Sequence, residues 1–160
     1  MARFLAYAAL LVMPLALVAQ APKPVSPEAL AADAERAKAA AEASTGEICT
    51  EMCLDAARKL AELSNQNFVD GHVEEAQANM RDAGKYAQKA AQESVRSHKR
   101  QKKTEIGLRH LTKRMQDIVH TLNFEDRPPV EQVIKSVEEA RSKLLSEMFG
   151  NPGKTFPEKK

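Results

Sequence analysis

The sequence predicts an all-α fold in which two antiparallel helical hairpins share one long central helix. Aromatic residues make up only 4% of the 160 residues, and Trp is absent. Ala, Glu, Lys and Gln are abundant, which is typical of helical chains. Apolar residues also recur every three or four positions along three segments, the spacing of one helix face.

Residues 1–21 are expected to be a cleaved secretory signal and not part of this fold. Arg3 precedes an uncharged run from Phe4 to Ala19, and small residues close the segment at Ala19 and Ala21. This is the order of a positive region, an apolar region and an A-x-A-like cleavage site. A retained N-terminal membrane anchor is the alternative, although the run is shorter than the roughly 20 residues that span a bilayer. We expect the protein in the periplasm or outside the cell.

Residues 22–44 predict a Pro/Ala-rich linker followed by a weak helix. Ser26, Pro27 and Glu28 provide an N-cap, a proline for the first turn and an acidic residue near the helix N-terminus. The segment that follows is almost entirely alanine and charge, with Leu30 as its one large apolar residue. Because it has little to bury, we expect it to be weakly docked or mobile.

The helical domain is predicted over 45–149, and its first helix over about 45–69. Ser44 and Glu47 match a capping box at its start, and Asp70-Gly71 suits its end. Cys49 and Cys53 lie beside the apolar stripe, which consists of Ile48, Met52, Ala56, Leu60, Leu63 and Phe68.

A single register continues from 72 to 122. Its seam is small and apolar as far as Ala90, polar from Ser94 to Thr104, and large and apolar as far as Leu122. No proline interrupts it, so we favour one helix of about 50 residues, near 75 Å long, with coiled-coil-like packing. Two helices with a bend between 97 and 107 are the alternative.

The last helix is predicted over 129–149, after the turn NFEDRPP, with a disordered tail over 150–160. The upper part of the central helix would pack on 45–69 and the lower part on 129–149. Each hairpin is thin, so a protein partner or a homodimer is expected to complete the core. The apolar stripe of the last helix consists of Val130, Val133, Ile134, Val137, Ala140, Leu144, Leu145 and Met148.

Residues 60–90 resemble one tetratricopeptide-type helical hairpin. The pattern G-x-x-E-E-A-x6-A is carried by Gly71, Glu74, Glu75, Ala76 and Ala83, after Leu60 and Leu63. The resemblance implies a glycine turn between two closely crossing helices. Met80 replaces the usual aromatic residue and Ala87 the usual proline, and no second unit follows. No ligand-binding residues are implied.

The two cysteines, Cys49 and Cys53, are candidates for a disulfide or for reactive thiols. A separation of four residues puts them on one helix face, with Cβ atoms farther apart than a relaxed disulfide allows. A bridge between two chains, a local bridge in a distorted first turn and buried free thiols all stay open. A zinc site lacks further ligands, and no metal or cofactor is predicted.

A basic run, His98, Lys99, Arg100, Lys102 and Lys103, is the candidate anion-binding site. It would bind an anionic envelope polymer or lipid head groups. The alternative is a solvated stretch of helix. No aromatic residues interleave to stack on bases, so nucleic acid is not an expected partner.

No catalytic motif is recognised. Adjacent acids such as Glu74 and Glu75 point in different directions on a helix, and no nucleophile elbow or phosphate loop is present. With 24 basic and 22 acidic residues, the chain carries little net charge. We therefore expect an exported, non-enzymatic scaffold or interaction module. A polyanion or membrane-surface binder is the alternative, and a thiol- or metal-responsive sensor is a third option.

Overall fold

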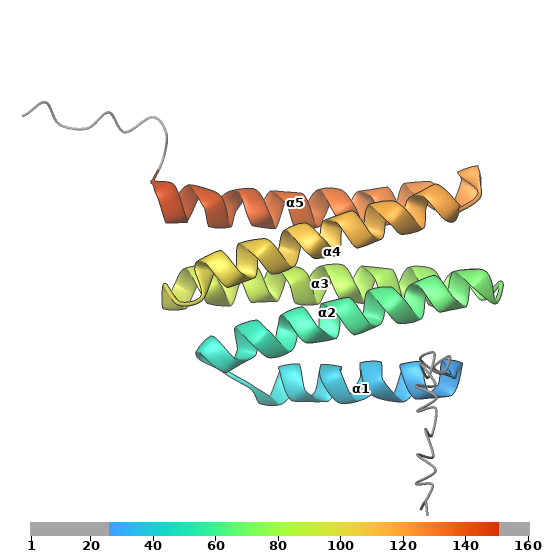
Figure 1. Ribbon diagram of the computed structural model, residues 1–160, viewed down its shortest axis with the longest axis horizontal. Coiled ribbons are helices and arrows are strands. Elements are labelled where there is room, and N and C mark those ends of the chain that lie inside the picture. The colour runs from blue at the N-terminus through green and yellow to red at the C-terminus, as the bar shows by residue number, and fades with distance from the viewer. Residues whose placement is uncertain (1–25, 151–160) are drawn as a thin grey trace, which may run out of the picture.

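The computed structural model describes residues 26–150 and confirms the all-α class. This part of the chain contains no strand and no helix long and apolar enough to cross a membrane. The predicted signal segment and residues 151–160 of the predicted tail lie outside it. The helices, drawn in Figure 1, are α1 (Pro27–Ala43), α2 (Gly46–Val69), α3 (Val73–Ser97), α4 (Gln101–Thr121), the short η1 (Phe124–Asp126) and α5 (Arg127–Phe149).

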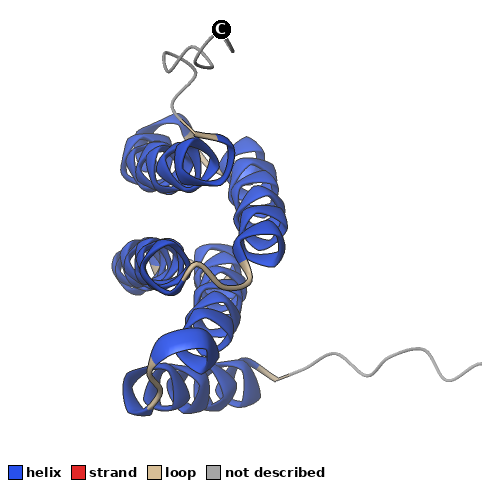
Figure 2. Ribbon diagram, turned by 90° about the vertical axis from the view of Figure 1, so that its left-hand side faces the viewer, coloured by secondary structure: helices blue, strands red, loops and turns tan. Residues whose placement is uncertain are grey.

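The helices form a two-layer stack. Viewed end-on, α3 and α5 lie on one side and α2 and α4 on the other, with α1 against the end of the stack beside α2 (Figures 1 and 2). The contact between α2 and α3 is the most extensive, and α5 contacts both α3 and α4. The predicted pairing of the last helix with the lower half of the central segment is therefore present as α4 against α5.

The predicted continuous central helix is wrong. The segment breaks into α3 and α4 at residues 98–100, which lie at the edge of the range considered for a bend. His98 and Arg100 both adopt left-handed backbone conformations, with φ of 53° and 54°. The chain thus reverses direction, and α5 packs against α3 as well as α4. The fold is two stacked hairpins, α2–α3 and α4–α5, that share no helix.

The polar stretch of the seam stabilises this reversal. The Ser94 hydroxyl donates to the carbonyl oxygen of Lys99 at 2.8 Å, and the Thr104 hydroxyl donates to that of Arg100 at 3.0 Å. Ser97 accepts a hydrogen bond from the Lys99 backbone N–H at 3.3 Å. The Ser94 and Ser97 bonds satisfy the backbone groups of Lys99, which lies in the break, while the Thr104 hydroxyl adds to the backbone bond that the Thr104 N–H already donates to Arg100. Residues expected to bridge two hairpins along one helix instead hold the turn between them.

The seam itself is the core. The register that predicted a long helix correctly identifies the inward positions on both sides of the break, because each half has the helical period separately. Folding back lets both halves face neighbouring helices. The buried seam residues are Ala76, Met80, Ala83, Ala87, Ala90, Ser94, Thr104, Leu108, Leu111, Met115, Ile118 and Leu122, and those of α5 include Val130, Val133, Ile134, Val137 and Leu144.

Helix α1 packs on α2 chiefly through alanines, so how firmly it is docked stays a prediction. Ala34 and Ala41 are fully buried and Ala37 nearly so, against α2. Alanines have little bulk to bury, but their small size lets the backbones of two helices approach closely. The predicted N-cap is confirmed, since Ser26 accepts a hydrogen bond from the Ala29 backbone N–H at 3.2 Å.

Two expectations for the start of α2 are wrong. The N-cap residue is Thr45 and makes no side-chain capping bond, while Ser44 donates to the Ala41 carbonyl oxygen at the end of α1. Only two residues separate α1 from α2, and the Ser44 hydroxyl caps the end of α1 and not the start of α2. Ile48, expected in the core stripe, is 62% exposed, and Cys49 and Cys53 are buried in its place.

Two glycines mark close approaches between the hairpins. A Cβ atom added at Gly84 of α3 would lie 2.7 Å from Val133 Cγ1 of α5. One added at Gly107 of α4 would lie 3.0 Å from Leu54 Cδ1 of α2. Each stacking contact, α3 on α5 and α2 on α4, therefore uses a residue without a side chain.

Candidate functional site

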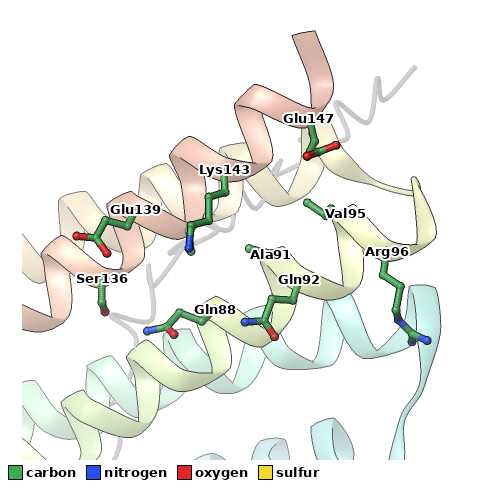
Figure 3. A pocket seen from close by; sticks show the side chains of 10 residues that line it. Gln88, Ala91, Gln92, Val95, Arg96, Ser136, Glu139, Lys143 and Glu147 are labelled. Atoms are coloured by element: carbon green, nitrogen blue, oxygen red, sulfur yellow. The ribbon is translucent and has the colours of Figure 1, made fainter. Parts of the chain in front are cut away.

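The structure has an open groove between α3 and α5, with a volume of about 420 Å³. Side chains from both helices face it (Figure 3). Its apolar lining is formed by Ala91 and Val95 of α3 and by Ala140 of α5. These residues also pack against the core, so the groove is a shallow opening onto the apolar layer of the stack.

Polar and charged side chains surround this apolar lining. Gln88 and Gln92 come from α3 and Ser136 from α5, while the charges are the cations Arg96 and Lys143 and the anions Glu139 and Glu147. From Ser136 to Glu147 the groove follows α5 for about 16 Å, or three helical turns. It combines an apolar centre with a rim of both charge signs, which is the usual composition of a protein-binding surface.

The sequence has a recognisable pattern for the α3 side of this groove, but none that shows α5 is its other side. Gln88, Ala91, Gln92 and Val95 recur at helical spacing beside the predicted seam. A second stripe of uncharged residues beside the seam is consistent with another neighbour for this helix. That neighbour is α5, which lies beside α3 only because the chain breaks at 98–100.

In the predicted basic site, some of the basic groups form ion pairs with α2 and the others do not. Arg100 Nε lies 2.6 Å from Glu47 Oε1, and Arg100 and Lys103 both pair with Glu51. The hydrogen bond from Lys103 is the main reason that the pKa of Glu51 lies below its usual value. His98, Lys99 and Lys102 are exposed and form no ion pair within residues 26–150. Two of the five basic groups thus fix the α3–α4 turn on α2.

The two cysteines are free thiols in the core, beneath α1. Cys49 is 2% exposed and Cys53 is fully buried, with 3.4 Å between the two Sγ atoms. Burial, with the neighbouring Cys49 thiol as a second cause, raises the pKa of Cys53 to about 12. The Cys53 thiol therefore stays protonated near neutral pH. Burial places both sulfur atoms out of reach of a second chain docked on this surface.

The end of α1 lies over this thiol pair and is held there by contacts with α2 and α3. Lys89 of α3 forms an ion pair with Glu42 of α1 at 3.1 Å, and the Cys49 thiol donates to the Ala41 carbonyl oxygen at 3.9 Å. Burial, followed by the Glu42 carboxylate, raises the pKa of Tyr86 to about 12. The end of α1 is thereby held over the cysteines by groups from α2 and α3.

Within residues 26–150 no three His, Cys, Asp or Glu side chains are grouped to hold a metal ion. The four histidines are exposed and far apart in sequence: His72 precedes α3, His98 lies in the α3–α4 turn, and His110 and His120 lie almost three helical turns apart in α4. The groove, the basic turn and the thiol pair are thus three separate candidate sites. Comparisons with protein-family models, with curated proteins and with solved structures found no match to this chain.

Proposed function

We propose that this protein is an exported, non-enzymatic interaction module that binds a partner protein in the α3–α5 groove. The observation that carries the proposal is the groove itself, with an apolar centre formed by Ala91, Val95 and Ala140 and a charged rim. Apolar surface that the fold leaves uncovered between two packed helices is favourable to bury on binding.

The partner element that fits is an amphipathic α-helix of about three turns. The groove lies between two helices, and a third helix would bury small apolar side chains against them, as in other helix-in-groove complexes. The rim would select it by charge, because Lys143 favours an acidic residue and Glu139 and Glu147 favour basic ones, whereas Arg96 is already paired with Glu93 of α3.

Site-specific photo-crosslinking in the producing cell tests this function. A crosslinker at Gln92, on the rim, is expected to give a discrete adduct with one partner, and the same group at Arg109, an exposed residue of α4, is not. Val95→Glu is expected to abolish the adduct, because it places a charge in the apolar centre. Val69→Glu, at a residue that is 73% exposed at the other end of the stack, is the matched control.

Thermal unfolding of Val95→Glu establishes that the variant is still folded. Adducts of equal yield from Gln92 and Arg109, or an adduct that persists in folded Val95→Glu, would show that the groove is not the binding surface. The export part of the proposal has its own measurement. Cell fractionation with N-terminal sequencing is expected to find a mature chain outside the cytoplasm that starts close to residue 22.

A second candidate function is binding of an anionic polymer or a membrane surface. It is supported by the exposed His98, Lys99 and Lys102 at one turn. The double variant Lys99→Gln, Lys102→Gln is expected to weaken binding to vesicles that contain anionic lipid, and more so at low salt. Lys113→Gln, Lys135→Gln removes the same charge elsewhere. Equal binding by the two variants would eliminate this candidate.

A further inference from the structure

Cys49 and Cys53 place their sulfur atoms side by side on one face of α2. Residues four apart on a helix have Cβ atoms about 5–6 Å apart, and the two Sγ atoms, one bond further out, are separated by 3.4 Å. The Cys49 sulfur has a second, longer contact at 3.9 Å, with the Ala41 carbonyl oxygen. The thiols therefore already point toward one another.

The first turn of α2, which carries Cys49, is held by a long backbone hydrogen bond. Cys49 lies in the first turn, and its N–H reaches the Thr45 carbonyl oxygen at 3.4 Å, the long limit for such a bond. Gly46, where the helix begins, has φ of +59°, and a Cβ atom there would meet no atom within 4 Å. A disulfide requires the sulfur atoms to move from 3.4 Å to roughly 2.05 Å, a shift that the first turn of α2 would have to take up.

We propose that Cys49 and Cys53 are a latent redox pair that converts to an intrachain disulfide by exchange with a disulfide oxidant, at a rate set by the lifting of α1. A Cys49 thiolate attacks one sulfur of the oxidant and releases its other half as a thiol. Cys53 then loses its proton and attacks Cys49, which releases the second thiol. Two protein thiols are oxidised and one oxidant disulfide is reduced to two thiols.

Helix α1 controls access because it covers the pair. With both residues buried, an oxidant reaches them only when α1 separates from α2 and α3. That helix is attached by small side chains, chiefly Ala34, Ala37 and Ala41, and by the ion pair between Glu42 and Lys89. Few large apolar contacts imply a low free energy of local opening. The inference does not depend on the groove, and it concerns a different face of the molecule.

The test is oxidation of the purified, reduced mature protein by oxidised glutathione. Alkylation in denaturant is expected to show slow loss of both thiols together, in a product that stays monomeric on non-reducing gels. Met52 lies between the two cysteines, so cyanogen bromide cleavage there leaves the two fragments joined only when Cys49 and Cys53 are bridged. Cys53→Ser, which keeps the attacking Cys49, is expected to give a glutathione adduct and no joined fragments.

Two alanine variants test the role of α1. Ala34→Glu places a carboxylate at a fully buried position and is expected to speed oxidation about tenfold or more by favouring the open state. Ala40→Glu, on the exposed side of the same helix, is expected to oxidise at the wild-type rate. Thiols that stay free even in Ala34→Glu, or a bridge only between chains, would overturn the redox pair. Equal rates in the two variants would overturn control by α1.

Discussion

At the scale of single residues, the two stacking glycines differ in what a methyl group would meet. Gly84→Ala would drive Cβ to 2.7 Å from Val133 Cγ1, a branched side chain that is itself buried. The overpacking cost of about 1–3 kcal/mol should exceed the roughly 1 kcal/mol that alanine gains in helix propensity. We expect Gly84→Ala to lower the free energy of unfolding by about 1 kcal/mol, measured by urea denaturation.

Gly107→Ala is the matched comparison, because its contact is looser. The added Cβ would lie 3.0 Å from Leu54 Cδ1, the far end of a flexible side chain. We expect this variant to be neutral or stabilised by up to about 1 kcal/mol. Adding Val133→Ala to Gly84→Ala should recover part of the loss as a favourable coupling energy. Equal effects of the two glycine substitutions would show that helix propensity, and not the approach of α5, determines both.

The left-handed residue His98 gives a second prediction at this scale. A side chain in this conformation costs about 1 kcal/mol relative to glycine, and His98 is exposed with φ of 53°. We expect His98→Gly to raise the free energy of unfolding by about 0.5–1 kcal/mol. Lys99→Gly, next to it but without a positive φ, should give no increase. A loss of stability in His98→Gly would mean that its ring contributes to the turn.

At the scale of helices, acid should loosen the α3–α4 turn from α2. The pKa of Glu51 is lowered mainly by its hydrogen bond with Lys103, and Arg100 adds a Coulombic contribution. A carboxylate with a lowered folded-state pKa stabilises the protein above its unfolded pKa of about 4.3, and that contribution is lost as the pH falls through the folded value. The unfolding midpoint of the wild type should therefore fall more steeply below about pH 4 than that of Glu51→Gln.

Glu62→Gln removes an exposed carboxylate of α2 that forms no ion pair within the described chain, and it serves as the control. It should retain the wild-type pH dependence. If Glu51→Gln and Glu62→Gln have the same slope, the pairing of Glu51 with Lys103 and Arg100 does not stabilise the folded state.

The helices themselves were largely predictable from the sequence, and the break was not. Periodicity identified Met80, Leu108 and Val137 as buried because inward positions repeat with the helical period whatever the neighbour is. The same register runs through Ser94 and Thr104 whether the chain continues straight or reverses. The polar stretch made a bend between 97 and 107 an alternative, but no proline or glycine marks residues 98–100 as the end of a helix. The gain from packing α3 on α5 is a tertiary effect.

At the scale of the whole molecule, the groove was not predictable because one continuous helix over 72–122 would not place α3 beside α5. Its lining comes from α3 and α5, which are neighbours only because the chain folds back. The thiol pair and the basic residues were identifiable by residue type and spacing alone. Their surroundings were not, because the ion pairs of Arg100 with Glu47 and Glu51 join positions about 50 residues apart in sequence. Residue chemistry is visible in the sequence, and long-range partners are not.

The stack also predicts uneven stability along the chain. Contact is most extensive between α2 and α3, while α5 closes the far end of the stack. In such a layered architecture each helix depends on its neighbours, so the end hairpin α4–α5 should open before α2–α3. Val137 is fully buried in α5, and Val137→Ala should cost about 2 kcal/mol of local stability.

Native-state hydrogen exchange measures this directly. Val137→Ala should speed exchange of the protected amides in α5 and α4 by about tenfold or more, and leave the slowest amides of α2 unchanged. Leu60→Ala, at a fully buried position of α2, is the control and should speed exchange in all the helices, because the other hairpin packs on this one. Uniform acceleration by Val137→Ala would instead mean that both hairpins unfold as one cooperative unit.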